Sequence, residues 1–251
     1  MSFSQITSRQ NPLIKHIRKL CADAAYRREV GLYVADGWKL LDDALRSGVV
    51  PQTVVAAEKA VLPALPPETR VITVPNALMD SLSFTDTPQG VLFTCKIPTP
   101  PSVPERGRWL LLDRIQDPGN VGSILRTAEA FGLDGVLLTN GCADPFSPKA
   151  VRAAMGATFR LTVLCRGDFQ SPVGVHSTPL PLIITDMGGE TVREFPRDCV
   201  VILGNEGAGV SAELREMASR TISIPMKGKA ESLGVAAAAA VICWEMSKCP
   251  H

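Results

Sequence analysis

Apolar and polar positions alternate along the first hundred residues in short blocks typical of helices and strands. Apolar residues recur at helical spacing at Ile14, Ile17, Cys21 and Ala24. Asn11–Pro12 has the order of a capping residue and a first helical residue. The expected elements are helix 12–28, strand 32–35, helix 38–46, strands 53–57 and 71–74, helix 75–81 and strand 90–95. This alternation predicts a small α/β domain.

From residue 109 the β-α alternation is continuous. Its strands are short apolar runs such as LLL and VVIL, which are typical of parallel sheets covered on both faces. The expected elements are strand 109–113, helix 120–131, strand 135–139, helix 148–155 capped by Ser147, strands 159–164, 182–185 and 200–203, helix 211–218, strand 221–224 and helix 233–248. The pattern predicts a second α/β domain built on a parallel sheet.

A proline-rich segment separates the two parts. Residues 97–107 read IPTPPSVPERG, and proline favours extended backbone without donating hydrogen bonds. We therefore expect domains at 1–97 and 108–251, joined by a semi-rigid linker at 98–107.

Composition excludes several classes of protein. With 251 residues, 45% of them apolar, and a net charge of +1, the chain is neither disordered nor basic overall. Its longest apolar run, 235–244, is half of the roughly 20 residues that a membrane span needs, and the first residues lack a secretory pattern. Seven cysteines without CxxC spacing predict reduced thiols and a cytoplasmic location.

Positive charge is concentrated near the N-terminus. Six basic residues between positions 9 and 28 face the single acid Asp23, which gives this segment a charge of +5. A basic helix face can follow the phosphates of a nucleic acid, although a solvated surface helix has the same composition. The candidate RNA-binding residues are Arg9, Lys15, Arg18, Lys19, Arg27 and Arg28.

Three glycine-containing segments directly follow strands of the second part. They read DRIQDPGNVGSILRTAEAFG at 113–132, LGNEGAGVS at 203–211 and IPMKGKAESLGVAAAAA at 224–240. Ligands of open α/β sheets bind outside the carboxyl ends of the strands, so the three turns are expected to share one ligand. The glycines at 204, 207 and 209 do not form GxGxxG, no GxxxxGK[ST] or GxSxG is present, and three histidines predict no metal site.

In this order the three segments resemble the motifs of the SpoU/TrmH family of RNA ribose 2′-O-methyltransferases, part of the SPOUT superfamily. SPKAVRAAMGA at 147–157 extends the resemblance. The segments SRQNPLIKHIRKL, VADGWKLL and TDTPQGVL resemble the RNA-binding domain that often precedes the methyltransferase. The resemblance implies a trefoil knot in the C-terminal parallel-sheet domain, bound S-adenosylmethionine, a homodimer, and structured RNA as substrate. Ribosomal RNA is slightly favoured over transfer RNA.

The resemblance also assigns site residues. Implied contacts to the cofactor are Thr139, Asn140, Gly141, Leu203, Gly204, Ile224, Met226 and Leu233. Implied catalytic positions are Asn120, Arg126, Glu206 and Ser232.

Three of the four catalytic positions also have a purely structural interpretation. Asn120 and Ser232 stand where they would cap helices, and Glu206 suits a solvated turn or a partner for Arg126. Arg126 projects away from the apolar stripe of its helix and suits a phosphate clamp. A role as proton acceptor is chemically demanding because a guanidinium stays protonated.

Two positions depart from the family pattern. Gly234 stands where the family usually has asparagine, and Asp36 where related leaders often have glutamate. The loss of the amide at 234 motivates one alternative, a catalytically silent RNA-binding relative. A dinucleotide-dependent oxidoreductase is a second alternative, disfavoured by the missing GxGxxG.

Overall fold

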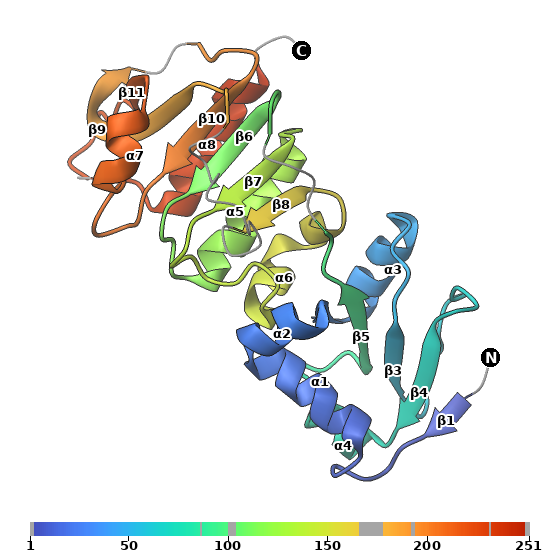
Figure 1. Ribbon diagram of the computed structural model, residues 1–251. Coiled ribbons are helices and arrows are strands. Elements are labelled where there is room, and N and C mark those ends of the chain that lie inside the picture. Colours follow the sequence, from blue (N-terminus) through green and yellow to red (C-terminus); the bar gives the residue numbers. More distant parts are fainter. Residues whose placement is uncertain are drawn as a thin grey trace. The chain divides into compact units, whose positions relative to one another are not determined.

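The computed structural model describes residues 3–85, 87–99, 104–165, 178–191, 194–230 and 232–248 (Figure 1). Its contacts divide the chain into two compact units. Unit 1 comprises Met1–Thr99 and Phe146–Phe159, and unit 2 comprises Pro100–Pro145 and Arg160–His251. Residues 100–103 of the expected linker lie outside the described residues.

Unit 1 is built on a mixed five-stranded sheet with the order β1-β4-β3-β5-β2. β5 runs antiparallel to both of its neighbours, and the other pairs are parallel. The sequence pattern did not predict β1, which has three residues. The elements are β1 (Phe3–Gln5), α1 (Pro12–Ala22), α2 (Ala24–Val30), β2 (Leu32–Asp36), α3 (Trp38–Arg46), β3 (Thr53–Ala57), β4 (Arg70–Val74), α4 (Asn76–Asp80), β5 (Val91–Lys96), α6 (Pro148–Ala154) and the 3₁₀ helix η1 (Ala157–Phe159).

The expected single helix over residues 12–28 is wrong, because the structure breaks it at Asp23. Asp23 has extended backbone, and its carboxylate accepts a hydrogen bond from the Tyr26 N–H, so it caps a second helix. The first helix begins as expected, with the Asn11 side chain capping it. It buries Ile14, Ile17 and Leu20 against the sheet.

A segment from the second half of the sequence belongs to unit 1. α6 packs on β2, one of the two edge strands of this sheet. The ring of Phe146 lies 5.1 Å from that of Tyr33, and the ring of Phe159 lies 6.4 Å from that of Phe93. Ser147 caps α6 as expected. Two aromatic contacts thus fix α6 and η1 to the core of unit 1.

Unit 2 is built on a six-stranded sheet with the order β11-β9-β10-β6-β7-β8, and all its strand pairs are parallel. This confirms the predicted parallel sheet. The elements are β6 (Arg108–Leu112), α5 (Pro118–Ala130), β7 (Gly135–Leu138), β8 (Thr162–Cys165), β9 (Leu182–Thr191), β10 (Cys199–Leu203), α7 (Ala212–Met217), β11 (Arg220–Ser223) and α8 (Val235–Ser247). The central strands β6 and β10 are buried at every position, which explains their uninterrupted apolar sequences.

β9 is longer than the expected strand 182–185 because it contains an excursion at residues 185–189. β11 pairs with Ile183 and Ile184, and the pairing then resumes at Glu190 and Thr191. A Cβ at Gly189 would lie 2.5 Å from the Ile222 backbone, so only glycine allows this close return. The excursion places residues 185–187 outside the sheet. The expected strand 159–164 is likewise shifted, since η1 precedes β8.

No helix in the described part of the chain is long and apolar enough to cross a membrane. The six cysteines that the structure describes are free thiols.

Candidate active site

A buried aspartate organises the carboxyl end of the parallel sheet. Asp113 directly follows β6 and is 2% exposed. Its carboxylate accepts hydrogen bonds from the Ser211 N–H at 2.7 Å, the Thr139 hydroxyl at 3.1 Å and the Arg114 guanidinium at 3.2 Å. Burial acts to raise the pKa of Asp113, but the hydrogen bonds from Arg114 and Ser211 outweigh it and lower the pKa. One carboxylate therefore ties together the loops after β6, β7 and β10.

Thr139 acts within this network. Its hydroxyl donates to Asp113 and accepts a hydrogen bond from the Arg114 N–H at 3.0 Å. Neither Thr139 nor its neighbours Asn140 and Gly141 line the cavity described below. The structure thus gives the Thr139 side chain a structural task.

The segment 204–211, here called the Glu206 turn, is closed by its own backbone. Asn205 and Gly209 exchange two backbone hydrogen bonds, and the Asn205 side chain accepts from the N–H groups of Gly207 and Ala208. A Cβ at Gly204 would lie 2.4 Å from the Gly209 carbonyl carbon. Gly204 therefore permits the close approach that shapes this turn. Leu203 and Gly204, like Thr139, do not line the cavity.

Asn120 and Glu206, two expected catalytic residues, are hydrogen-bonded to each other. The Asn120 amide donates to Glu206 Oε1 at 2.8 Å. Asn120 does not cap α5, because Asp117 accepts the Asn120 backbone N–H at 2.9 Å and is the capping residue. The capping interpretation of Asn120 is therefore wrong, and its side chain is available to Glu206.

Arg126 stands apart from this pair. It is exposed on α5 and makes no hydrogen bond or ion pair with any other residue that the structure describes. The interpretation of Glu206 as a partner for Arg126 is therefore wrong in this structure. An exposed guanidinium without an internal partner is free to contact an external anion.

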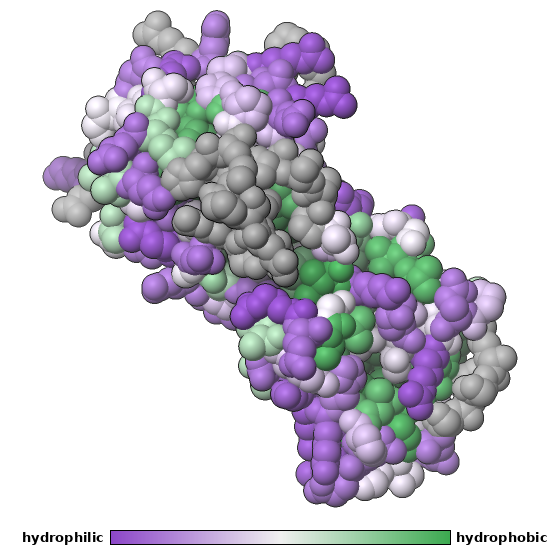
Figure 2. Space-filling view, in the orientation of Figure 1, coloured by the Kyte–Doolittle hydropathy of each residue, from purple (hydrophilic) through white to green (hydrophobic). Residues whose placement is uncertain are grey.

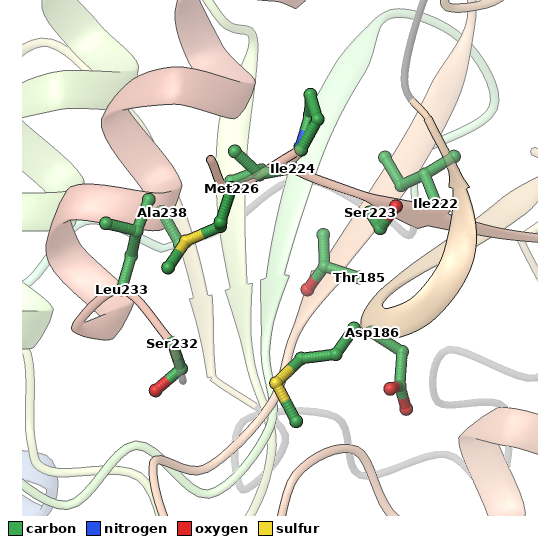
Figure 3. A pocket seen from close by; sticks show the side chains of 11 residues that line it. Thr185, Asp186, Ile222, Ser223, Ile224, Met226, Ser232, Leu233 and Ala238 are labelled. Atoms are coloured by element: carbon green, nitrogen blue, oxygen red, sulfur yellow. The ribbon is translucent and has the colours of Figure 1, made fainter. Parts of the chain in front are cut away.

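A cavity of about 370 Å³ lies beside the β9 excursion and the start of α8. Its walls are residues 185–187, residues 222–226 at the end of β11 and directly after it, and Ser232, Leu233 and Ala238 (Figure 3). Of the expected site residues it gathers Ile224, Met226, Ser232 and Leu233. In Figure 3, Met226 and Leu233 lie on one side of the pocket and Thr185 on the other.

The start of α8 differs from the expectation. The helix begins at Val235 with Gly234 at the capping position and no side-chain capping bond. Ser232 is therefore not the helix cap, and it lies exposed on the cavity wall. The glycine at 234 leaves both the helix end and the cavity rim without an amide side chain.

The lining of the cavity suits a ligand with apolar and hydrogen-bonding parts. Ile224, Met226 and Leu233 supply apolar surface, and Thr185 and Ser232 supply hydroxyls, a mixture typical of small-molecule sites of this volume. Met226 and Leu233 remain more than one-third exposed, so a ligand would remove apolar surface from water. Among the described residues, no group of three His, Cys, Asp or Glu side chains is placed to hold a metal ion.

The basic residues of unit 1 divide into surface and interior positions. Arg9, Lys15, Lys19 and Arg28 are exposed, and Arg18 is half-buried with a hydrogen bond to Ser81 at 3.0 Å. Figure 2 shows a hydrophilic surface over α1.

Arg27 has to be removed from the expected RNA-binding set. It is 3% exposed, and its guanidinium donates to the Leu20 carbonyl at 2.5 Å. Asp36 is also occupied, since it accepts a hydrogen bond from the Ser83 hydroxyl at 2.6 Å. Burial raises the pKa of Asp36. Both side chains are hydrogen-bonded within unit 1.

The fold and site define a class of protein: an α/β protein with a small-molecule cavity at the carboxyl end of a parallel sheet. The family model described as the SpoU rRNA Methylase family matches residues 108–244, and an MRM3-like substrate binding domain matches residues 11–92. The chain belongs to the SpoU rRNA methylase family.

Full-length relatives and solved structures agree with this assignment. The chain is 33% identical to the 23S rRNA (guanosine(2553)-2′-O)-methyltransferase RlmP of Bacillus subtilis, over 96% of this chain and 98% of that protein. The AdoMet-bound rRNA methyltransferase of Sinorhizobium meliloti superposes with a TM-score of 0.80 at 30% identity, covering 97% of each chain. AviRb of Streptomyces viridochromogenes in complex with AdoMet has a TM-score of 0.83 at 28% identity, covering 95% of this chain and 98% of that chain.

Proposed function

We propose that this protein transfers a methyl group from S-adenosylmethionine to a ribose 2′-hydroxyl of structured RNA, with ribosomal RNA favoured over transfer RNA. The observation that carries the proposal is the cavity that gathers Ile224, Met226, Ser232 and Leu233 from the third family segment. The hydrogen bond between Asn120 and Glu206 adds a link between the first two segments. The similarity to RlmP, which is named a 23S rRNA methyltransferase, favours ribosomal RNA.

The residues of the cavity suit the cofactor. Ile224, Met226 and Leu233 would hold its apolar parts, and the Ser232 and Thr185 hydroxyls would bind its polar groups. When bound, S-adenosylmethionine supplies an electrophilic methyl group on a sulfonium. The other contacts that the resemblance implies for the cofactor, at Thr139, Asn140, Gly141, Leu203 and Gly204, stay proposals because these residues do not line the cavity.

The chain's own residues then position the ribose and take up its proton. Asn120 holds Glu206 through Oε1, which leaves Oε2 without a partner among the described residues and able to accept the proton of the 2′-hydroxyl. Arg126 would bind the phosphate of the target nucleotide through its planar fork. Holding the hydroxyl in line with the methyl group supplies most of the rate gain.

Methyl transfer in vitro tests this function. The purified protein would be incubated with radiolabelled S-adenosylmethionine and ribosomal or transfer RNA that lacks its own modifications. Label in a 2′-O-methylnucleoside after complete digestion is the expected result. Label in no RNA, with cofactor binding intact by calorimetry, would instead support the silent RNA-binding relative that Gly234 suggests.

We further propose that unit 2 contains the trefoil knot of the SPOUT superfamily, and that residues 1–97 form an RNA-binding domain separated by the linker at 98–107 from the methyltransferase domain at 108–251. Residues 146–159 of the latter pack in unit 1. Support for the knot is the family match and the sheet order, in which β10 lies between β9 and β6. Support for the RNA-binding domain is the substrate-binding model that matches residues 11–92. A ribosomal RNA substrate in a bacterium would place the protein in the cytoplasm.

Charge reversal at two exposed lysines of α1 tests the RNA surface. Lys15→Glu with Lys19→Glu is expected to weaken RNA binding and to flatten its salt dependence by about 0.7–0.9 per lost phosphate contact. Affinity for S-adenosylmethionine should not change. The matched control is Lys39→Glu with Lys59→Glu, which changes the net charge equally at exposed positions of unit 1. Equal salt slopes for both double variants would indicate that α1 is a solvated surface helix that does not bind RNA.

A homodimer is the proposed assembly, with α8 at its interface. Trp244 is 52% exposed on α8, and the exposed Ala237 lies on the same side of the helix about two turns earlier. Light scattering at micromolar concentration is expected to give twice the chain mass of 26.8 kDa, and Trp244→Glu to give the monomer. A wild-type mass of one chain would contradict the dimer.

A further inference from the structure

Two aspartate–arginine pairs hold neighbouring carbonyl groups of the Glu206 turn. Arg114 donates to the Gly209 carbonyl at 3.1 Å, and Arg215 donates through Nε to the Val210 carbonyl at 3.0 Å. These contacts were not predicted from the sequence. They place a guanidinium on each of two successive peptide groups that close the turn.

Arg114 is fixed by strong constraints. Its guanidinium pairs with the buried Asp113 at 3.2 Å, and its own carbonyl accepts a hydrogen bond from the Asn205 amide at 2.8 Å. Its φ of 57° lies in the left-handed region, which is unfavourable for a non-glycine residue. A strained backbone that presents a side chain to a candidate catalytic turn points to a positional role.

Arg215 connects the turn to the cofactor cavity. It lies on α7, and its Nη2 pairs with the Asp186 carboxylate at 2.5 Å. Asp186 belongs to the β9 excursion that forms one wall of the cavity, and Figure 3 shows its carboxylate turned away from Met226 and Leu233. Asp186 therefore faces its arginine. The hydrogen bond from Arg215 lowers the pKa of Asp186, so the pair is ionised near neutral pH.

The other bonds of the excursion join it to the sheet and do not reach the turn. Thr185 donates to the Ile202 carbonyl at 3.0 Å, and Ser223 donates to the Gly189 carbonyl at 2.8 Å. Arg215 alone among the described side chains bonds both the excursion and the Glu206 turn. A displacement of the cavity wall would therefore also displace the Glu206 turn, because Arg215 is bonded to both.

We propose that Arg114 and Arg215 are positioning residues for methyl transfer, which brace the Glu206 turn, and that Arg215 also couples this turn to the cofactor cavity through Asp186. The inference rests on the proposed function. A carboxylate that must meet a 2′-hydroxyl within a few tenths of an ångström needs such support, since small displacements of reacting groups reduce rates steeply.

A double-mutant cycle with Glu206 separates positioning from general stabilisation. Arg114→Gln and Arg215→Gln are each expected to lower turnover by about tenfold or more in the wild-type background. In the Glu206→Gln background the same changes should lower turnover less than about twofold, because the group they position is already gone. Arg46→Gln, which removes a surface ion pair with Asp42 on α3, is the control and should not alter turnover.

Cofactor binding separates the two arginines. Arg215→Gln and Asp186→Asn should raise the dissociation constant of S-adenosylmethionine by about threefold or more, whereas Arg114→Gln should leave it unchanged. Arg215→Lys can keep the pair with Asp186 but not the simultaneous bond to Val210. It should therefore retain cofactor affinity and still lose turnover.

Three results would overturn the inference in an active wild-type enzyme. The first is that each arginine substitution lowers turnover by the same factor in the Glu206→Gln background as in the wild type. That result would indicate a loss of fold stability only. The second is wild-type turnover of Glu206→Gln, which would leave no group to position. The third is unchanged cofactor affinity in both Arg215→Gln and Asp186→Asn. A wild-type protein that methylates no RNA would refute the proposed function instead.

Discussion

Replacing Gly204 with alanine is expected to reduce methyl transfer by about 100-fold or more. The added Cβ would lie 2.4 Å from the Gly209 carbonyl carbon and from the Val210 nitrogen, so backbone must move. The movement would displace Glu206, which is held at 2.8 Å from Asn120. Rate losses of this size accompany misplacement of a reacting group by about 1 Å. Turnover with saturating RNA and S-adenosylmethionine is the measurement.

Gly207→Ala is the matched control within the same turn. A Cβ at Gly207 would meet only the Asn205 side-chain oxygen at 3.7 Å, which is ordinary van der Waals contact. This variant should keep turnover within about threefold of the wild type, in line with the small effects of unstrained surface changes. If Gly204→Ala retained as much activity as Gly207→Ala, the shape of this turn would not matter for the reaction.

Arg126→Ala is expected to lower turnover by about 100-fold while cofactor affinity and melting temperature stay unchanged. The fold should tolerate the change because Arg126 is exposed and has no hydrogen bond or ion pair within the described residues. Loss of one preorganised donor to developing charge has cost of this order in other enzymes. Arg126→Lys keeps the charge but not the planar fork, so it should restore little activity.

The pH profile separates a clamp from a base. If Arg126 only binds phosphate and stabilises charge, Arg126→Lys should lower the profile at every pH without changing its shape. A base at this position would shift the rising limb in the lysine variant. Arg46→Ala removes an exposed helical arginine from α3 and is the control for nonspecific loss of charge. Near wild-type methylation by Arg126→Ala would remove this residue from the catalytic assignment.

Hydrophobic periodicity predicted most helices and strands because the apolar positions of each element face the core of its own unit. The parallel sheet of unit 2 followed from runs such as VVIL, which the structure buries completely in β10. The break at Asp23 was missed because the apolar spacing continues across it, although aspartate is a strong capping residue. The start of α5 was misplaced by two residues. Asp117–Pro118 carries the same cap-and-proline signal as Asn11–Pro12 and would have identified the cap.

The roles of the site residues stay predictions, and the structure adds contacts between them that the sequence did not predict. The third segment gave Ile224, Met226, Ser232 and Leu233, which the structure gathers around one cavity. The hydrogen bonds of Arg114 and Arg215 to the Glu206 turn were not predicted. Arg114 has a left-handed φ and bonds Gly209, which is 95 residues away in the sequence. Arg215 bonds Val210, five residues away, and no sequence pattern revealed either contact. Arg27 was misassigned because charge predicts exposure, whereas two helix-end carbonyls bind it in the interior.

Mapping of 2′-O-methylated nucleotides in total RNA, from cells with and without this protein, tests the proposed reaction most directly. The account predicts at least one 2′-O-methyl site in a structured RNA that disappears without the protein. That site should return when the wild-type chain is supplied and stay absent with Arg126→Ala. Identical 2′-O-methyl maps with and without the protein would contradict the central claim.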